Sequence, residues 1–544
     1  MKSFQQSAEE DPDGDGDSEP KRQLRPRERS VFSRRGFLAG AGLVGATAVA
    51  TASYAGHDAI SGALTRVAGH PGGASSSGST LSGAAAPASG KPPGPAAPPD
   101  RTFVSTQLTA AHVSSWATAA TAAGLIFAGP QGHGSSGLIV DNHGEPVWME
   151  PTGVGVTDLR VQTFEGKPVL TYWTGTGTGG HGMGSGSILD TGYQPVAQVN
   201  AGNGLKADLH EFTLTEAGTA LLIAYPTVPY DLRPVGGPAN GFIYDCHVQE
   251  VDVRSGAVLL DWSAVAHIDI TETYVQPGDN NASADGTSEA KAFDPFHLNS
   301  VDESGDALLV SSRHMHALYL VDRTAGTLRW RLGGKRSDFK VADNAAFAWQ
   351  HDARRRSATS LTVFDNHYSS GSTGISRGLL LNVDESARTV TLQQEFSHAG
   401  HRGNAEGNVQ LLGNGHYLVG WGADPAVTEF TPDGTALYES IGLGNASYRT
   451  YRCAWTGRPA TVPDIAVLPG NGSSMQVYAS WNGATEVASW RFLTGETLQS
   501  LMPAGTVPRR GFETSTAVAA AAKVAVQALH SDGSVLATSK AVST

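Results

Sequence analysis

Histidine and arginine side chains recur at the same point of several repeated segments in this chain. His210, His297 and His351 each stand just before or at the start of a short apolar run. Guanidinium groups bind tetrahedral oxyanions through two parallel hydrogen bonds, and imidazole can act as base, acid or nucleophile near neutral pH. If the fold brings these side chains together, the sequence predicts an anion-binding site with histidine chemistry.

A single histidine at the start of a strand is more often a hydrogen-bonded structural group. Several that come from separate repeats are harder to explain in that way, which favours a functional site. Clustered histidines can also hold zinc or copper. The only close pair, His314 and His316, stands where a strand is expected to end. The sequence therefore predicts no metal site, and no cofactor is expected.

The repeated element is clearest in residues 294–354. Four runs rich in β-branched and aromatic residues are separated by Gly, Asp or Ser, and the opening motif returns at residues 349–354. Such runs predict a four-stranded antiparallel meander. A restart one meander later is typical of a propeller blade.

Five such segments are recognised, and a sixth is divided between distant parts of the chain. The five begin at Asp158, His210, His297, His351 and Asn408. The interval after His210 is the longest, and we attribute its extra length to an insertion at residues 269–290. Three further runs at 125–149 lack an inner strand, which residues 448–455 can supply. The sequence predicts an all-β, six-bladed β-propeller over residues 104–455, closed so that no sheet edge is left exposed.

Strand direction places the polar residues within this fold. In a meander the start of the first strand, the end of the second and the start of the third share one side, and first strands line the central channel. One mouth of the channel is therefore expected to gather His210, His297, His351, Arg313, His314, Asp365, Asn366, His367, Ser376, Arg377, Tyr448 and Arg449.

The N-terminal hundred residues are typical of an export signal followed by a linker. Arg34 and Arg35 precede a weakly apolar, Gly/Ala-rich run, so residues 1–56 are predicted to be a twin-arginine signal. This signal is either cleaved near residues 53–55 or kept as an anchor. Residues 57–103, rich in Gly, Ala, Ser and Pro, are predicted to be a disordered linker. The protein is expected to be exported and then either secreted or associated with the cell envelope.

Residues 456–544 show alternating strands without the blade rhythm. They predict a small C-terminal fibronectin-III-like β-sandwich, with a seventh blade as the alternative. Cys246 and Cys453 form either a disulfide or two buried thiols, and both alternatives stay open. A net charge of −13 without a basic cluster outside the leader argues against nucleic acid as a partner.

An ordered set of motifs resembles the bacterial arylsulfotransferase family over most of residues 101–455. The motifs are FHLNSV (296–301), LLVSSRH (308–314), WRLGG (330–334), FAWQHDAR (347–354), FDN (364–366), SR (376–377) and GWG (420–422). The resemblance implies a six-bladed propeller that transfers a sulfuryl group from an aryl sulfate ester to a phenol. It implies no 3'-phosphoadenosine phosphosulfate, and the transfer passes through a sulfohistidine.

The resemblance also implies roles for individual residues. Catalytic roles fall to His297, His351 and Arg377. Apart from the resemblance, substrate-binding roles are predicted for His210, Asn299, Arg313, His314, Asn366, Tyr448 and Arg449. The small-molecule partners implied are an aryl sulfate and a phenol, and no oligomeric state is implied.

One position departs from the family pattern. The nucleophilic histidine of a Thr-His-Tyr-Arg stretch is replaced here by Ser447, and a serine hydroxyl needs an adjacent base to become a nucleophile. Either another histidine such as His351 or His314 accepts the sulfuryl group, or transfer is direct, or the fold has lost the chemistry. The alternative functions are a non-catalytic secreted propeller that binds an acidic or sulfated cell-surface ligand, and a metal or redox propeller.

Overall fold

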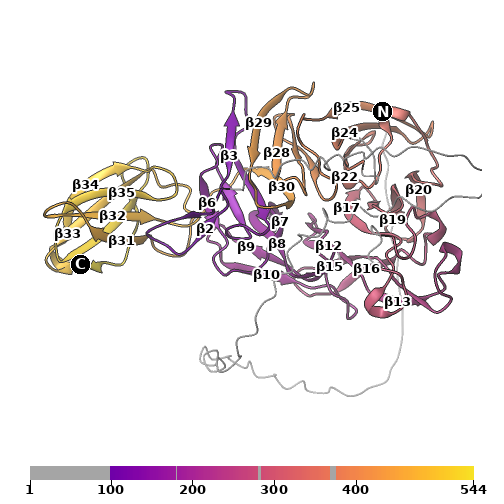
Figure 1. Ribbon diagram of the computed structural model, residues 1–544, viewed down its shortest axis with the longest axis horizontal. Coiled ribbons are helices and arrows are strands. Elements are labelled where there is room, and N and C mark those ends of the chain that lie inside the picture. Colours follow the sequence, from indigo (N-terminus) through magenta and orange to yellow (C-terminus); the bar gives the residue numbers. More distant parts are fainter. Residues whose placement is uncertain (1–97, 179, 280–283, 368–374) are drawn as a thin grey trace, which may run out of the picture. The chain divides into compact units, whose positions relative to one another are not determined.

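The computed structural model describes residues 98–178, 180–279, 284–367 and 375–544 (Figure 1). The predicted twin-arginine signal and all but the end of the predicted linker lie outside these residues. The described chain is all-β, and its five helices are 3-10 turns of three residues. None of the helices in these ranges is long and apolar enough to cross a membrane.

Six sheets follow one another along residues 125–453, and each is built on four antiparallel strands. The first holds β30 (Ser447–Cys453), β4 (Leu125–Pro130), β5 (Leu138–Val140) and β6 (Pro146–Met149), and the second β7 (Thr157–Phe164), β8 (Lys167–Thr178), β9 (His181–Leu189) and β10 (Pro195–Val199). The third holds β11 (Phe212–Leu214), β12 (Thr219–Ala224), β15 (His247–Asp252) and β16 (Val258–Ser263), and the fourth β17 (Leu298–Ser304), β18 (Ala307–Ser312), β19 (Ala317–Asp322) and β20 (Leu328–Gly333). The fifth holds β22 (His351–Ser357), β23 (Ser360–Asp365), β24 (Arg377–Asp384) and β25 (Thr389–Phe396), and the sixth β26 (Asn408–Leu411), β27 (Tyr417–Gly420), β28 (Ala426–Phe430) and β29 (Ala436–Ile441).

Neighbouring sheets contact each other in a closed, propeller-like cycle. Contacts join β7 to β11, β12 to β17, β17 to β22, β22 to β26, β26 to β30, and β30 back to β7. The predicted meander of residues 294–354 is confirmed by β17 to β20. The predicted closing strand is confirmed as well, because β30 pairs antiparallel with β4 and places Cys453 opposite Leu125.

Apolar side chains from both faces of each sheet are buried against the next sheet. All six residues of β18 are buried. Leu308 and Val310 pack in one cluster with Leu221 of β12, whereas Leu309 packs in another with Leu361 and Val363 of β23. Because side chains alternate along a strand, one continuous apolar run serves two interfaces.

The long interval after His210 carries two insertions, of which the sequence prediction identified one. The unpredicted insertion is a hairpin of β13 (Thr227–Tyr230) and β14 (Gly241–Tyr244) with η1 (Arg233–Val235), placed between β12 and β15. Its strands have ordinary strand composition, so they were not distinguishable from blade strands. The predicted insertion contains η2 (Ile270–Glu272) and η3 (Glu289–Lys291).

Residues ahead of the first sheet are ordered in a way the sequence did not predict. β1 (Arg101–Thr102) pairs with β2 (Thr109–Ala110), and β3 (Ser114–Ala117) joins the sixth sheet through β29. Residues 101–102, at the end of the predicted linker, therefore form a strand. Arg101 binds Glu145 through two hydrogen bonds of 3.0 Å each, and such contacts fix a segment whose composition alone predicts disorder.

Two antiparallel sheets follow β30 (yellow in Figure 1). One holds β31 (Asp464–Pro469), β32 (Ser474–Ser480) and β35 (Thr514–Ala519), and the other β33 (Ser489–Gly495), β34 (Met502–Pro508), β36 (Lys523–Leu529), β37 (Val535–Thr538) and β38 (Val542–Ser543). Val477, Trp490 and Val526 belong to a single core cluster. Strand β21 (Lys340–Val341) pairs parallel with β25 at the edge of the fifth sheet. The turns η4 (Asp343–Ala345) and η5 (Leu498–Ser500) complete the described elements. Cys246 and Cys453 are free thiols, so the structure contains no disulfide between them.

Candidate active site

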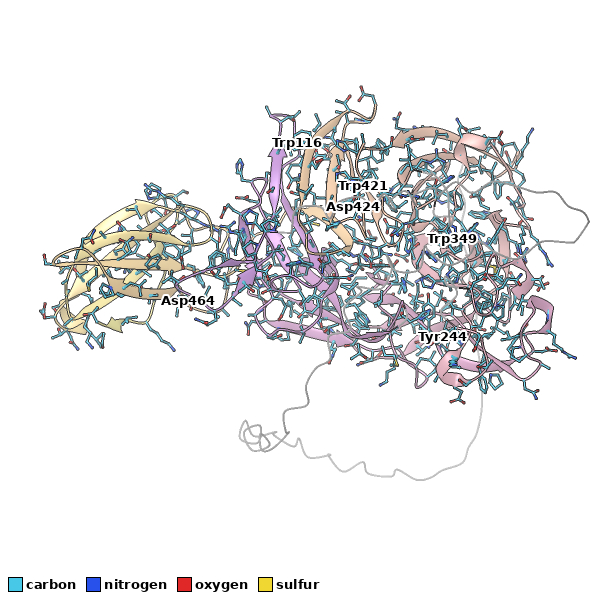
Figure 2. All side chains as sticks on the ribbon, viewed as in Figure 1. Trp116, Tyr244, Trp349, Trp421, Asp424 and Asp464 are labelled. Atoms are coloured by element: carbon cyan, nitrogen blue, oxygen red, sulfur yellow. The ribbon has the colours of Figure 1, made fainter. Side chains whose placement is uncertain are left out.

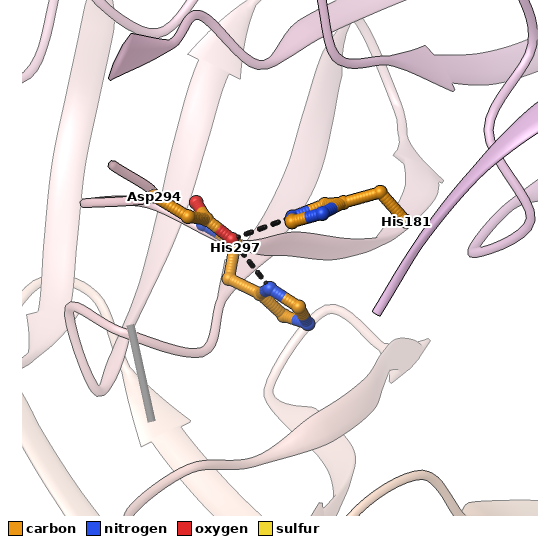
Figure 3. A group of neighbouring side chains, drawn as sticks. All are labelled: His181, Asp294 and His297. Atoms are coloured by element: carbon orange, nitrogen blue, oxygen red, sulfur yellow. Dashed lines mark hydrogen bonds and ion pairs between the residues drawn. The ribbon is translucent and has the colours of Figure 1, made fainter. Parts of the chain in front are cut away.

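The carboxylate and carbonyl of Asp294 hold three histidines in the middle of the ring of sheets. One carboxylate oxygen accepts hydrogen bonds from Nδ1 of His297 at 2.6 Å and from Nε2 of His181 at 2.8 Å (Figure 3). The backbone carbonyl of Asp294 accepts from Nδ1 of His314 at 2.7 Å. Asp294 itself is fully buried. A single residue thus fixes the ring orientation of imidazoles from three elements.

Local backbone geometry places His297 for this contact. The residue directly precedes β17 and has a φ of 50°, in the left-handed region that few residues other than glycine adopt. Its backbone N–H donates to the second carboxylate oxygen of Asp294 at 2.8 Å. Strain of this kind persists only where the surroundings hold it, and it is common at functional sites.

A second aspartate–histidine pair lies beside the first. His210 bonds Oδ2 of Asp208 through Nδ1 at 2.5 Å, and Asp208 also accepts from the backbone of Gly182. The ring centroids of His210 and His297 are 4.9 Å apart, in an edge-on arrangement. The phenol of Tyr448, from the closing strand, lies 5.5 Å from the ring of His210.

Arg313 brings the cationic group into this cluster. Its guanidinium donates to Nε2 of His314 at 2.9 Å and lies 4.7 Å from the ring centre of Trp349. Trp349 is labelled in Figure 2. Since His314 accepts from Arg313 at Nε2, it must carry its proton on Nδ1, which donates to Asp294. Both ring nitrogens of His314 are therefore engaged.

His351 is oriented by Asn366 at the end of β23. The Nδ1 of His351 and the side-chain oxygen of Asn366 are 2.7 Å apart. The amide nitrogen of Asn366 donates to the carbonyls of Gly403 and Glu406, which fixes its oxygen toward the imidazole. The proton of His351 accordingly lies on Nδ1, and its Nε2 carries the lone pair.

Burial keeps several of these imidazoles neutral. Desolvation, reinforced by the neighbouring imidazoles of His210 and His181, lowers the pKa of His297 to about 3 despite the attraction of Asp294. Desolvation, with Arg313 nearby, also holds the pKa of His351 well below its usual range. The carboxyl group of Asp294, in contrast, stays ionised despite its burial. Burial would raise its pKa, but His297 and His314 outweigh this effect and hold the pKa well below the ordinary value.

A neutral His297 with its proton on Nδ1 presents the lone pair of Nε2. No partner for this nitrogen is found among the residues that the structure describes. The side chain of His297 is 11% exposed, whereas that of His314 is 1% exposed, so His297 is the more accessible of the two. An aspartate that orients a histidine through Nδ1 is the arrangement that readies Nε2 for proton transfer or nucleophilic attack.

Three of the residues singled out from the sequence serve other contacts. Arg377 donates to Asp365 at 3.0 Å, to Glu395 at 2.8 Å and to the carbonyls of Asn344 and Ala346. Arg449 is fully buried and pairs with Asp158, Glu211 and Asp352. Asn299 donates to the carbonyl of Gln350. These contacts tie strands together and involve none of the clustered histidines.

Ser447 is also turned to a structural contact. Its hydroxyl accepts from the backbone N–H of Gly129 at 3.2 Å and donates to the carbonyl of Arg449 at 3.2 Å. The next residue, Tyr448, is the one that reaches His210, since neighbouring side chains on a strand point to opposite faces. The position that resembles the family's nucleophile thus lies outside the histidine cluster.

Sequence reasoning missed His181, Asp208 and Asp294 as site residues. A signal for two of them was present, because an aspartate stands two residues before His210 and three residues before His297. His181 follows a glycine-rich stretch in a long hairpin and carries no comparable local signal. Its contact with Asp294 joins residues 113 positions apart in the sequence.

His181, Asp294 and His297 also offer ligand atoms close enough to hold a metal ion. Asp294 already bridges both rings through hydrogen bonds, so an ion would have to replace the protons on two imidazoles. Burial alone would lower the pKa of His181, but the hydrogen bond and charge of Asp294 outweigh it and raise the pKa above the usual value. The arrangement favours protons over a metal at this point.

Among curated proteins, none matches this chain. Solved structures with a similar fold include a protein of unknown function from Bacteroides caccae, 11% identical with a TM-score of 0.35, covering 60% of this chain and 98% of that one. Another is a protein of unknown function from Dyadobacter fermentans, 11% identical with a TM-score of 0.33, covering 67% of this chain and 95% of that one. A third is an inactive variant of virginiamycin B lyase from Staphylococcus aureus, 8% identical with a TM-score of 0.30, covering 67% and 94%.

The model of the family described as arylsulfotransferase (ASST) matches residues 160–442, which is more than half of the chain and includes Asp208, His210, Asp294, His297, Arg313, His314 and His351. The chain belongs to the arylsulfotransferase family.

Proposed function

We propose that this protein transfers a sulfuryl group from an aryl sulfate ester to a phenol at the centre of a six-bladed propeller. The six sheets of residues 104–455 serve as the blades, and residues 456–544 form a fibronectin-III-like sandwich. Family membership supports the reaction class. The observation that carries the proposal is the Asp294–His297 pair, with its 2.6 Å hydrogen bond and its neutral imidazole.

His297 is the proposed nucleophile. Its Nε2 lone pair forms a bond to sulfur while the bond from sulfur to the aryl oxygen breaks, and the phenolate leaves with that electron pair. Asp294 stabilises the imidazole as it gains positive charge. His314 is less suited to this step because both of its ring nitrogens are engaged.

His351 and Arg313 complete the proposed reaction. The oxygen of the acceptor phenol attacks sulfur, its proton passes to the neutral Nε2 of His351, and the bond from sulfur to His297 breaks. His351 then returns the proton to solvent or to the departed phenolate. Arg313 neutralises charge on the sulfuryl oxygens, a preorganised contribution on the order of 3 kcal/mol per donor. Arg313 takes the role that the resemblance gave to Arg377.

His210, Asn366 and Tyr448 support the proposed site from its sides. Asn366 orients His351, His210 lies beside His297, and Tyr448 lies beside His210. The substrates are small molecules rather than nucleic acid. The twin-arginine signal proposed for residues 1–56 places the reaction outside the cytoplasm, either in the medium or at the cell envelope.

The test is phenol-dependent release of p-nitrophenol from p-nitrophenyl sulfate. Wild-type protein is expected to release it and to yield phenyl sulfate, whereas His297→Asn is expected to lose at least about 1000-fold in kcat. Ser447→Ala serves as the matched control and keeps the wild-type rate. Wild-type protein that binds p-nitrophenyl sulfate without turning it over would favour the non-catalytic alternative instead.

A further inference from the structure

A second cluster of titratable side chains lies outside the candidate active site, in the segment between β25 and β26. His398 and His401 of this segment and Glu439 of β29 each direct one ligand atom to a common point, and the three atoms lie within 4.8 Å of one another. Nε2 of His401 is 3.4 Å from Oε2 of Glu439, and Nδ1 of His398 is 3.9 Å from the same oxygen.

These separations are close to those of a zinc site. Bonds of about 2.0 to 2.2 Å in a tetrahedral site separate the ligand atoms by about 3.4 Å. Nε2 of His401 and Oε2 of Glu439 already meet this value, and the hydrogen bond between them, at 3.4 Å, is long and therefore weaker than those of Asp294, so an ion replaces it more easily. His398 has to approach by about half an ångström, and it belongs to an irregular segment rather than to a strand, where such an adjustment is least constrained.

The side chain of His398 gives a second, independent indication of a ligand at this point. Its Nδ1 is shielded from solvent and has no hydrogen-bond partner among the described residues. Buried polar atoms in native proteins nearly always have a partner, and each exception calls for an explanation such as an ion. This nitrogen faces the same carboxylate oxygen as His401, so a cation between the three groups would satisfy it.

The surroundings of His401 fit a histidine ligand. Its Nδ1 lies 3.0 Å from Oδ2 of Asp424, which also accepts the backbone N–H of Arg402 at 3.0 Å. A carboxylate that accepts a hydrogen bond from one ring nitrogen of a histidine fixes the tautomer in which the other ring nitrogen, here Nε2, can bind metal. This arrangement is common in zinc proteins. The ring of Trp421 stacks on His401 at 5.5 Å. Trp421 and Asp424 are both labelled in Figure 2.

We propose that His398, His401 and Glu439 form a site for one divalent transition-metal ion, with Zn²⁺ as its best-suited occupant. Two imidazole nitrogens and one carboxylate match the ligand preference of zinc, and water completes the coordination. The proposal is independent of the sulfuryl transfer described above.

The position of the site gives the ion a structural consequence. The same segment supplies the carbonyls of Gly403 and Glu406 that hold Asn366, and Asn366 orients His351. An ion bound to His398 and His401 from the segment and to Glu439 from β29 fixes the segment against the sixth sheet. The metal thereby supports the wall of the candidate active site without entering it.

The experiment uses the full chain, stripped with a chelator and titrated with ZnCl₂ alone by calorimetry, with bound zinc counted by elemental analysis. One ion per chain is expected. His398→Ala and His401→Ala are expected to weaken binding at least tenfold, and Asp424→Asn by roughly 10- to 100-fold. His416→Ala is the matched control. His416 pairs with Glu429 at 2.8 Å in the same sheet and is not one of the three residues of the cluster, so its loss is expected to leave the affinity unchanged.

Three outcomes would overturn the proposal. One is a wild-type chain that binds no zinc, and another is undiminished binding by the two alanine variants. The third is binding that survives His401→Ala but disappears in His181→Ala, which would place the ion at Asp294. Glu439→Gln preserves size and shape, so it gives an answer even if an alanine variant fails to fold. Undiminished zinc affinity in folded Glu439→Gln would count against the proposal as well.

Discussion

Asp294 organises the candidate site through several hydrogen bonds at once. Its carboxylate accepts hydrogen bonds from the side chains of His181 and His297 and from the backbone N–H of His297. Its carbonyl accepts one from the side chain of His314. Hydrogen bonds to an ionised group are stronger than those between neutral groups, and burial from water strengthens them further. The orientation of His297 therefore depends more on this aspartate than on the strand that follows it.

Replacement of Asp294 by asparagine tests that dependence. The amide keeps the shape of the carboxylate but cannot stabilise the positive charge that develops on His297, and it offers one acceptor oxygen where the carboxylate has two. We expect kcat for aryl sulfate turnover to fall by about 10³ to 10⁴ with little change in KM. The matched control is Asp231→Asn, a surface aspartate paired with Arg233. Unchanged kcat in a folded Asp294→Asn variant would contradict the nucleophilic role of His297.

Arg377 and Arg313, both singled out from the sequence, are expected to behave differently on substitution. Arg377 holds the fully buried carboxylate of Asp365, which also receives the backbone N–H groups of Ala348 and His367. Arg377→Ala removes the guanidinium from that buried charge and leaves it the more distant Nδ1 of His367, at 3.7 Å, so we expect the free energy of unfolding to fall by about 3 kcal/mol.

Arg313→Lys keeps the positive charge but removes the planar fork. We expect this variant to keep its stability and to lose at least tenfold in kcat, because a lysine does not reproduce bidentate contacts. Chemical denaturation and steady-state rates, measured on both variants, separate the two effects. The proposed roles are reversed if Arg377→Ala is as stable as wild type and slower, while Arg313→Lys is unchanged in rate.

The sequence located His210, His297, His314 and His351 but neither His181 nor the aspartates that hold these rings, for a physical reason. Three of the four histidines stand at or just before the start of an inner strand and His314 follows a second strand, and strand order alone brings such positions to one mouth. Which arginine faces the histidines depends on side-chain direction and on competition from carboxylates. Arg377 meets Asp365 and Glu395, whereas Arg313 meets His314, and no local pattern in the sequence distinguishes these outcomes.

The element on which the ring of sheets depends is β30. It pairs with β4 across more than three hundred residues of sequence and carries Arg449 into the centre. Glu211 receives Arg354 at 2.7 Å and also Arg449 and Arg160. Burial would raise the pKa of Glu211, but these three guanidinium groups outweigh it and lower the pKa. Removal of β30 would leave a buried charge network incomplete and a sheet edge open.

Truncation before β30 is therefore expected to prevent folding, whereas truncation after it is not. A chain ending at Ala446 lacks the whole strand and is expected to show no cooperative thermal transition. A chain ending at Pro459 keeps the strand and is expected to melt cooperatively at a lower temperature. It loses the contacts of Asn482 with the backbone of Met149 and of Phe512 with Phe103. A full-strength transition in the shorter chain would contradict this role of β30.

At the scale of the whole molecule, repeats were the most reliable signal in the sequence. The restart points at Asp158, His210, His297, His351 and Asn408 each lie at or next to the beginning of an inner strand. What the repeats could not reveal is structure without periodicity. Short additions of this kind are β1, β3 and the hairpin of β13 and β14. Their positions are set by tertiary contacts, so no local sequence pattern predicts them.

Export of the whole chain is a separate prediction. Arg34 and Arg35 lie outside the described residues, and the expectation rests on their position ahead of a weakly apolar run. Replacement of both by lysine is expected to keep the protein in the cytoplasm, since a receptor reads the arginine pair rather than its charge. Fractionation of cells that express either form is the measurement. Equal amounts of both forms outside the cytoplasm would remove the basis for the predicted signal.

The last prediction concerns the response of the folded molecule to acid. The pKa of His297 is lowered to about 3 by burial, and burial also holds those of His314 and His351 well below the ordinary value of 6.5. Between pH 6.5 and those folded-state values, the unfolded chain binds more protons than the folded chain. The free energy of unfolding must therefore decrease as the pH falls through this window.

Each of these groups contributes on the order of 1 kcal/mol per pH unit at most. Histidines with raised pKa values, such as His181 and His401, do not offset this loss, because both their folded and unfolded forms are protonated below pH 6.5. Denaturation by urea at pH 6.5, 5.75 and 5.0 measures the effect, and His351→Asn should reduce the slope because it removes one of the three groups. A free energy of unfolding that stays constant from pH 6.5 to 5.0 would mean that these imidazoles are not held neutral, and the nucleophilic role proposed for His297 would lose its electrostatic basis.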